Sequence, residues 1–222
     1  MNYPQAPWNL KGSAVLTINL LDVERSRPFI PPELEIISVL PGKTVGGIYL
    51  SAYESGSLLQ YNELIVVAGL TRYQNQIGSW ISHIYVDNET SVAGGREIWQ
   101  LPKEMAQFTW KDGEVSVKQG DIPLCHLQYS KEWYSWATWW QQNTANSFSG
   151  LNTDLLLFNN SFSSQISLLS GKLTIPENSP FACLNLGQPW LTLEMDKLDL
   201  LAGKPNAIAN KKAFSPLYSY NN

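Results

Sequence analysis

Lys103 is the residue of this sequence whose surroundings would change its chemistry most. It follows Pro102 in the segment 92–105, where most neighbouring residues are apolar or small. A lysine in such a segment either extends its amine to the surface or is buried. In an apolar pocket, desolvation lowers the pKa of an amine and leaves a neutral nucleophile that can form a Schiff base with a carbonyl compound. Pro102 also favours the start of a helix, whose dipole would oppose the charged ammonium.

Glu63 is the second candidate, because it is a single acid in an apolar run. It lies two positions after Tyr61 and is followed by residues 64–67, which are all aliphatic. A carboxylate in such a run is costly unless it is paired, protonated or used in function. A structural salt bridge and a role in proton transfer are therefore both open for Glu63.

Four short motifs surround these two residues in a fixed order. They are Tyr61-Asn-Glu63, Tyr85-Val-Asp-Asn-Glu89, Gly95-Arg-Glu97 and Pro102-Lys103. As a set they resemble acetoacetate decarboxylase, over about residues 15–130.

The resemblance implies a site and a fold. Lys103 would be the imine-forming lysine, and Glu63 would lie near it in the active-site cavity. Tyr61, Arg96 and Glu104 are added as substrate-binding or supporting residues, and Arg96 is expected in an internal ion pair that fixes the segment carrying Lys103. The implied fold is mainly β (α+β), a closed or conical antiparallel β-barrel with a few short helices, assembled into a symmetric homo-oligomer.

The predicted function is that of a Schiff-base (lysine-imine) lyase. A protonated imine is an electron sink, so it can support decarboxylation of a keto acid, or aldolase-like or dehydratase-like reactions of a related carbonyl compound, with Glu63 moving protons. No metal or coenzyme is needed, and a place in secondary metabolism is expected. The alternative is a non-catalytic or differently catalytic protein that binds an apolar small molecule in the same cavity.

Three departures from the family pattern argue against acetoacetate itself as the substrate. Glu104 stands where the decarboxylase has a second lysine, a cation that activates its neighbour. Gly12 and Ile48 stand where the family has an arginine and a second glutamate. The residues considered as replacements for the missing cation are Lys11, Arg25 and Arg27.

Composition excludes several other functions. The net charge of −4 and the pI of about 5.2 provide no basic surface for nucleic acid or an anionic membrane. Cys125, Cys183, His83 and His126 have no metal-ligand spacing, so we expect no metal site and no disulfide framework. The chain has no signal peptide pattern and no apolar run of membrane-spanning length, which predicts a soluble cytoplasmic protein.

Turn-forming, aromatic and β-branched residues favour many short strands in one domain, residues 1–222. The strands expected are 14–21, 34–40, 44–53, 58–71, 77–86, 107–110, 114–118, 122–129, 155–158, 165–175 and 191–195. Segments 34–40 and 44–53 should form a hairpin, as should 107–110 and 114–118. Short helices are expected over 22–28 and 91–100, and a polar loop over 143–152. Core packing or a subunit contact is expected for Trp133, Trp136, Trp139 and Trp140.

Overall fold

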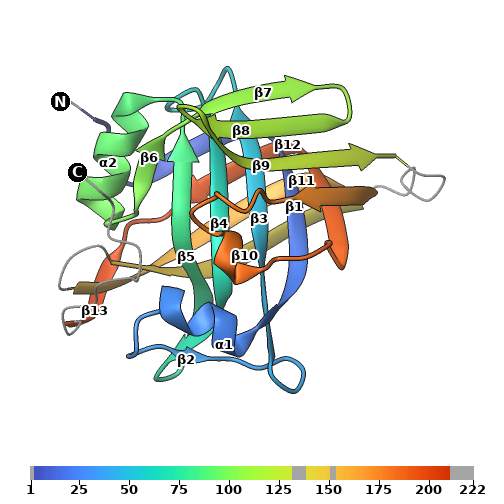
Figure 1. The fold of residues 1–222 in the computed structure, drawn as a ribbon. Coiled ribbons are helices and arrows are strands. Elements are labelled where there is room, and N and C mark those ends of the chain that lie inside the picture. Colours follow the sequence, from blue (N-terminus) through green and yellow to red (C-terminus); the bar gives the residue numbers. More distant parts are fainter. Residues whose placement is uncertain (1–2, 132–138, 151–153, 211–222) are drawn as a thin grey trace.

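The computed structural model describes residues 3–131, 139–150 and 154–210, and its centre is a ring of strands (Figure 1). The ring consists of β1 (Trp8–Asp22), β3 (Lys43–Tyr53), β4 (Tyr61–Tyr73), β5 (Gln76–Val86), β10 (Trp139–Ser149), β11 (Asp154–Thr174) and β12 (Leu191–Ala202). They pair in the order β10-β5-β4-β3-β1-β12-β11, and β11 pairs again with β10, so the circuit of hydrogen bonds closes. The predicted mainly β class is confirmed. One junction departs from the antiparallel pattern, because β10 and β5 run parallel.

A smaller sheet extends from the second half of β11. There β9 (Ile122–Ser130) pairs with β11, then β8 (Glu114–Gln119) with β9, and β7 (Gln107–Lys111) with β8. The predicted hairpin of residues 107–118 is therefore confirmed. Short strands complete the sheets: β2 (Glu35–Ile36) on β4, β6 (Lys103–Met105) on β5, and β13 (Asn206–Asn210) on β11.

The helices are few and short, as predicted. They are α1 (Val23–Ser26), the 3-10 turns η1 (Arg27–Phe29) and η2 (Ala182–Leu184), and α2 (Glu89–Trp99). The Asn88 side chain accepts a 3.0 Å hydrogen bond from the backbone N–H of Ser91 and so caps α2. Helix α2 lies beside β6, near the end of β5 where the strand reaches Val86 (Figure 1).

The expectations for segments 34–40 and 143–152 are wrong. Segment 34–40 does not form the expected hairpin ladder with β3. Its end meets β3 at the bridge between Leu40 and Lys43, but β2 pairs with β4 instead. The expected loop 143–152 is a strand through Ser149, and residues 151–152 lie outside the described residues. Asparagine and serine favour turns in isolation, but an eleven-residue ladder to β11 supplies backbone hydrogen bonds to this segment. Asn143 remains exposed, whereas Ser147 and Ser149 are buried and hydrogen-bonded.

Strand β4 is buried on both faces. Glu63, Ile65 and Val67 face a cavity inside the ring, whereas the alternate residues Leu64 and Val66 belong to the core outside it. This double burial explains why the segment is almost uniformly apolar. Since successive side chains point to opposite faces, the register of β4 places its one acid inside the ring.

The predicted subunit contact stays a prediction. Trp139 and Trp140 are 44% and 64% exposed, while Trp133 and Trp136 lie outside the described residues. Within the described part of the chain, no helix has the length and apolar character needed to span a membrane.

His83 generates a prediction about stability and pH. It is buried between the rings of Phe29, Phe181 and Tyr85, and burial lowers its pKa to about 4. Below about pH 6.5 the unfolded chain takes up a proton on this histidine that the folded chain does not, so the free energy of unfolding falls as pH decreases toward 4, by about 3 kcal/mol in total. His83→Phe should flatten this part of the profile, measured by urea unfolding between pH 7 and pH 4. Identical pH slopes for variant and wild type would contradict the assignment.

Candidate active site

Lys103 is buried, but at a different place in the backbone from the one expected. Helix α2 ends at Trp99, and Gln100 adopts a left-handed conformation (φ 49°) with its N–H donating to the carbonyl of Gly95. The chain then turns, and Lys103 opens β6, which runs parallel to β5 with Lys103 opposite Ile84. The prediction that Pro102 begins a helix is therefore wrong. In sequence Lys103 follows the C-terminal end of α2, but its side chain reaches back to Ser91 in the first turn of the same helix, so its amine lies near the positive end of the α2 dipole.

The amine of Lys103 forms a buried ion pair with Glu63. Lys103 Nζ lies 2.8 Å from Glu63 Oε1 and donates a second hydrogen bond, of 3.0 Å, to Ser91 Oγ. The two charged side chains are only 4% and 5% exposed. The ring centroids of Tyr61 and Trp8 lie 5.0 and 5.7 Å from Nζ, within the range of cation–π attraction. The structure thus brings together Lys103, Glu63 and Tyr61 as the sequence predicted.

Two tyrosines extend the hydrogen bonding from Glu63 along β3. Tyr53 OH donates to Glu63 Oε2 at 3.1 Å, and the Tyr49 and Tyr53 hydroxyls lie 3.3 Å apart. Both side chains lie on one face of β3, where Tyr53 pairs with Tyr61 of β4. Burial, together with the nearby charge of Glu63, raises the pKa of Tyr53 and of Tyr61 well above the ordinary value. These hydroxyls therefore remain protonated and can act as donors.

Two glycines of α2 let the helix pack directly onto the site. A Cβ at Gly95 would lie 2.5 Å from Lys103 Cδ, and one at Gly94 would lie 2.5 Å from the Trp8 ring. A glycine in a helix costs about 0.5–1 kcal/mol relative to alanine. Here the missing side chains leave the space that the lysine stem and the indole occupy.

Arg96 and Glu104 lie outside the cavity. Arg96 Nε donates to the backbone carbonyl of Lys103 at 2.7 Å, so it holds the Lys103 segment by this bond; among the described residues we find no carboxylate paired with it. The expectation that Arg96 forms an internal ion pair is therefore wrong, and a hydrogen bond to the backbone holds the Lys103 segment instead. Glu104 follows Lys103 on β6 and so points to the other side, where it accepts a 2.6 Å hydrogen bond from Gln119. Its charge is directed away from the amine.

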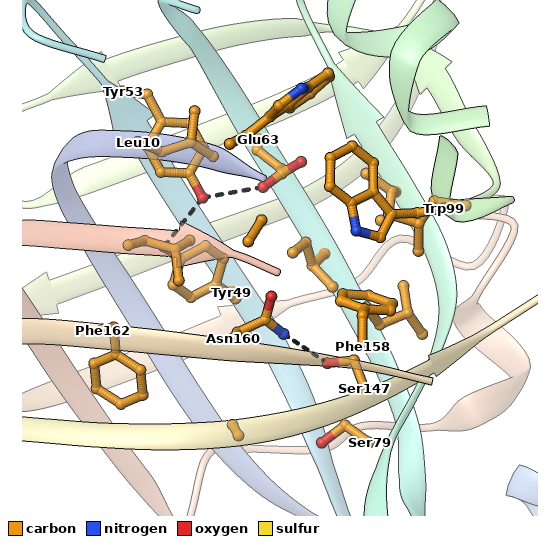
Figure 2. A pocket seen from close by; sticks show the side chains of 18 of the residues that line it. Leu10, Tyr49, Tyr53, Glu63, Ser79, Trp99, Ser147, Phe158, Asn160 and Phe162 are labelled. Atoms are coloured by element: carbon orange, nitrogen blue, oxygen red, sulfur yellow. Dashed lines mark hydrogen bonds between the residues drawn. The ribbon is translucent and has the colours of Figure 1, made fainter. Parts of the chain in front are cut away.

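The cavity beside the ion pair measures about 230 Å³ and is largely apolar (Figure 2). Its charged lining residues, among those that the structure describes, are Lys103 and Glu63. The other polar side chains that line it are Tyr49, Tyr53, Tyr61, Ser79, Ser147 and Asn160. The remaining walls are aliphatic and aromatic side chains from the ring strands, with Trp99 and Leu101 from the segment before β6.

The cations considered as replacements for the family arginine are engaged elsewhere. Lys11 lies 3.5 Å from Asp199, and Arg25 lies 3.8 Å from Asp22; these are pairs of half-exposed side chains. Arg27 donates to the carbonyls of Ile30, Pro31 and Leu34. Ile48 belongs to the core outside the ring, and Gly12 packs against the backbone of Ala52. Neither position supplies a charge to the cavity.

Metal ligation finds no support in the described side chains. Among residues 3–131, 139–150 and 154–210, no group of three His, Cys, Asp or Glu side chains is arranged to hold a metal ion. The polar atoms of the Lys103–Glu63 pair are hydrogen-bonded to each other and to Ser91 and Tyr53. What this arrangement can do chemically depends on the amine and the carboxylate.

Several site residues were not predicted from sequence. Tyr49 and Tyr53 were assigned to a strand, and their spacing of four positions already places them on one face. Ser91 lies three positions after Asn88. This spacing predicts that the Ser91 backbone N–H donates to the Asn88 side chain, but it does not predict that the Ser91 hydroxyl contacts Lys103. Trp8 precedes the first expected strand, 14–21, and no local pattern indicates that β1 begins there and brings its ring to Lys103.

Comparison with known proteins shows the family to which the chain belongs. The family profile described as acetoacetate decarboxylase (ADC) matches residues 2–132. Because this match covers more than half of the chain, the protein belongs to the acetoacetate decarboxylase family.

Two relatives illustrate the range of the family. The chain is 32% identical over 111 residues to the NEOXANTHIN-DEFICIENT 1 protein of Solanum lycopersicum, an alignment that covers 50% of this chain and 37% of that protein. It is 28% identical over 150 residues to acetoacetate decarboxylase of Burkholderia mallei, covering 59% of this chain and 56% of the enzyme. The alignments therefore span about a third to about half of the length of these relatives.

Solved structures share the fold over nearly the whole chain. Acetoacetate decarboxylase from Legionella pneumophila superposes with a TM-score of 0.74 at 16% identity, covering 95% of this chain and 90% of that one. The enduracididine biosynthesis enzyme MppR complexed with pyruvate superposes with a TM-score of 0.67 at 14% identity, covering 95% and 92%.

The ion pair generates a prediction about stability. Removing one member of a buried pair leaves an uncompensated charge, so Lys103→Met or Glu63→Leu alone should lower the free energy of unfolding by about 3–5 kcal/mol. The double variant should regain most of this loss, since no charge is then left unpaired in the apolar cavity. Urea unfolding of the four proteins gives the coupling energy. Losses that simply add in the double variant would contradict a direct interaction between the two side chains.

The close packing of the Lys103 side chain against Gly95 of α2 gives a second prediction. Gly95→Ala places a methyl group where the lysine stem lies, so Nζ must move away from Glu63. We expect a net destabilisation of about 1–2 kcal/mol, because overpacking outweighs the gain in helix propensity. Glu97→Ala, at an exposed position on the same helix, is the control and should change stability by less than about 0.5 kcal/mol. A Gly95→Ala protein more stable than wild type in thermal unfolding would show that the stem has room.

Proposed function

We propose that the protein is a Schiff-base lyase in which Lys103 forms an imine with a small carbonyl compound. The observation that carries this proposal is the pairing of Lys103 Nζ with Glu63 at 2.8 Å inside a largely apolar cavity. A buried ion pair contributes little net stability compared with apolar residues of similar size. Its position on the wall of a cavity, with space for a ligand beside it, is what a reactive amine and its proton acceptor require.

The reaction begins when a proton of the Lys103 ammonium passes to Glu63. The neutral amine adds to the carbonyl carbon, the carbonyl oxygen leaves as water with the two remaining amine protons, and Glu63 returns its proton to the imine nitrogen. Tyr53 donates to the other Glu63 oxygen throughout and keeps the carboxylate oriented toward the amine.

The protonated imine then accepts the electron pair of the neighbouring carbon–carbon bond. The fragment leaves as carbon dioxide from a β-keto acid, or as an aldehyde from a β-hydroxy ketone whose hydroxyl proton passes to Glu63. The enamine that remains takes up a proton on carbon, and water hydrolyses the imine to release the ketone and the lysine. Decarboxylase-like and aldolase-like reactions therefore share every residue of the site.

Two of the relatives support this class of chemistry. The Burkholderia mallei protein is named a decarboxylase, and MppR has been crystallised with pyruvate, a keto acid. A second candidate function, the binding of an apolar small molecule without reaction, is favoured by the apolar walls of the cavity. The name of the tomato relative, which refers to a deficiency in neoxanthin, does not specify a reaction.

Reductive trapping tests the proposal. The protein is incubated with a panel of ketones, aldehydes and keto acids, treated with borohydride and weighed by intact-mass spectrometry. We expect a reduced adduct on the wild-type chain, located on Lys103 by peptide mapping and abolished in Lys103→Ala. Lys11→Ala removes a half-exposed surface lysine and should retain the adduct. Binding of a carbonyl compound without any trapped adduct would favour the second candidate function.

A further inference from the structure

The cavity has a second polar region, away from the ion pair. Asn160 of β11 donates from Nδ2 to Ser147 Oγ of β10 at 3.1 Å, and Ser147 is in register with Ser79 across the parallel junction of β10 and β5. Figure 2 shows these three side chains grouped around the interior, apart from Glu63 and Tyr53. Three separate strands thus bring hydrogen-bonding groups to one part of an otherwise apolar wall.

This region keeps unused hydrogen-bonding capacity. Among the described residues, the Asn160 amide makes one hydrogen bond, to Ser147, although an amide group can make four. In Figure 2 its other terminal atom points away from Ser147, toward the part of the cavity where Glu63 lies. Ser147 is 7% exposed and Asn160 is half-buried, so a ligand there would meet polar groups with little water around them.

The wall between the two polar regions is apolar. Ile65 and Val67 of β4 and Ile81 of β5 line it on one side, and Phe158 and Phe162 of β11 line it on the other. Ser79 lies seven positions along β5 from Val86, the partner of Glu63 in β4, which corresponds to about 23 Å of strand. Because the Lys103 and Asn160 side chains extend into the cavity, the distance between the two polar regions is shorter than this strand length. An elongated ligand body fits between them.

The charges of the cavity restrict the ligand further. Lys103 and Glu63 neutralise each other, and no other described lining residue carries a charge. A carboxylate on the ligand would add a second negative charge in a desolvated space without a cation to pair it. An alcohol or carbonyl oxygen needs only hydrogen-bond partners, which Asn160 and Ser147 can provide.

We propose that the cavity selects an uncharged, bifunctional carbonyl compound. Its ketone or aldehyde carbon meets Lys103, an apolar body fills the middle, and a hydroxyl or carbonyl oxygen at its other end is bound by Asn160 and Ser147. This inference rests on the proposed function for the reacting end. The second oxygen and the absence of ligand charge follow from the cavity alone. Of the two proposed reactions they favour the aldolase-like cleavage, because a β-keto acid carries a carboxylate.

The test uses three matched series of probes of increasing chain length: 2-alkanones, the same ketones with a terminal hydroxyl, and the corresponding oxoalkanoic acids. Calorimetry measures binding to the full chain, and borohydride trapping measures imine formation on the same samples. At the best length we expect the hydroxy ketone to bind about threefold to tenfold more tightly than the plain ketone, the value of one hydrogen bond. The oxo acid should bind most weakly.

Variants assign the effect to the second polar region. Asn160→Leu should bring the affinity ratio of hydroxy ketone to plain ketone close to one, and Ser147→Ala, a smaller change, should reduce it. Asn159→Leu is the matched control, because Asn159 is the exposed neighbour on β11 and should keep the wild-type ratio. Circular dichroism confirms that each variant is folded.

The outcomes separate this inference from the proposed function. A ratio unchanged in both Asn160→Leu and Ser147→Ala, or an oxo acid that binds as tightly as the hydroxy ketone, overturns the inference even if adducts form. The expected ratios in calorimetry support it even if no adduct is trapped. In that case the imine chemistry fails while the ligand class stands.

Discussion

The pairing of two desolvated charges is the constraint on which the site depends. Neither Lys103 nor Glu63 would be tolerated alone at such burial, so the elements that carry them must meet. The register of β4 turns Glu63 inward, and the chain reversal after α2 starts β6 at Lys103. Gly95 lets the helix pack against the lysine stem, and Gly94 lets it pack against Trp8. Tyr53 and Ser91 then complete the hydrogen bonding of the pair.

The surroundings of the pair distinguish this member of the family from the pattern suggested by its motifs. A carboxylate ligand would need a cation beyond Lys103, and Lys11, Arg25 and Arg27 are paired at the surface or bound to backbone carbonyls. Glu104 takes the position after the lysine but hydrogen-bonds to Gln119. The cavity therefore combines one paired amine with walls suited to uncharged molecules, a combination compatible with imine chemistry on substrates unlike acetoacetate.

Much of this could be predicted from sequence, for identifiable reasons. Lys103, Glu63 and Tyr61 sit in short motifs, the Asn cap marks the start of α2, and Asp-Gly marks the turn of the β7–β8 hairpin. The backbone around Lys103 could not be predicted, because it depends on a left-handed Gln100, a conformation that glutamine rarely adopts. Strand β10 was also missed, since its partner β11 rather than its own polar residues determines its structure. Trp8 reaches the site only through tertiary packing.

Glu63 and Lys103 belong to parts of the fold that are held by different numbers of strand pairings. Glu63 is built into the hydrogen-bonded ring, whereas Lys103 comes from a three-residue strand added to the edge of β5. Changes in that short strand can alter or remove the nucleophile while the ladders of the ring stay intact. The position of the amine therefore depends on a short peripheral strand, whereas the walls of the cavity depend on the long ladders of the ring.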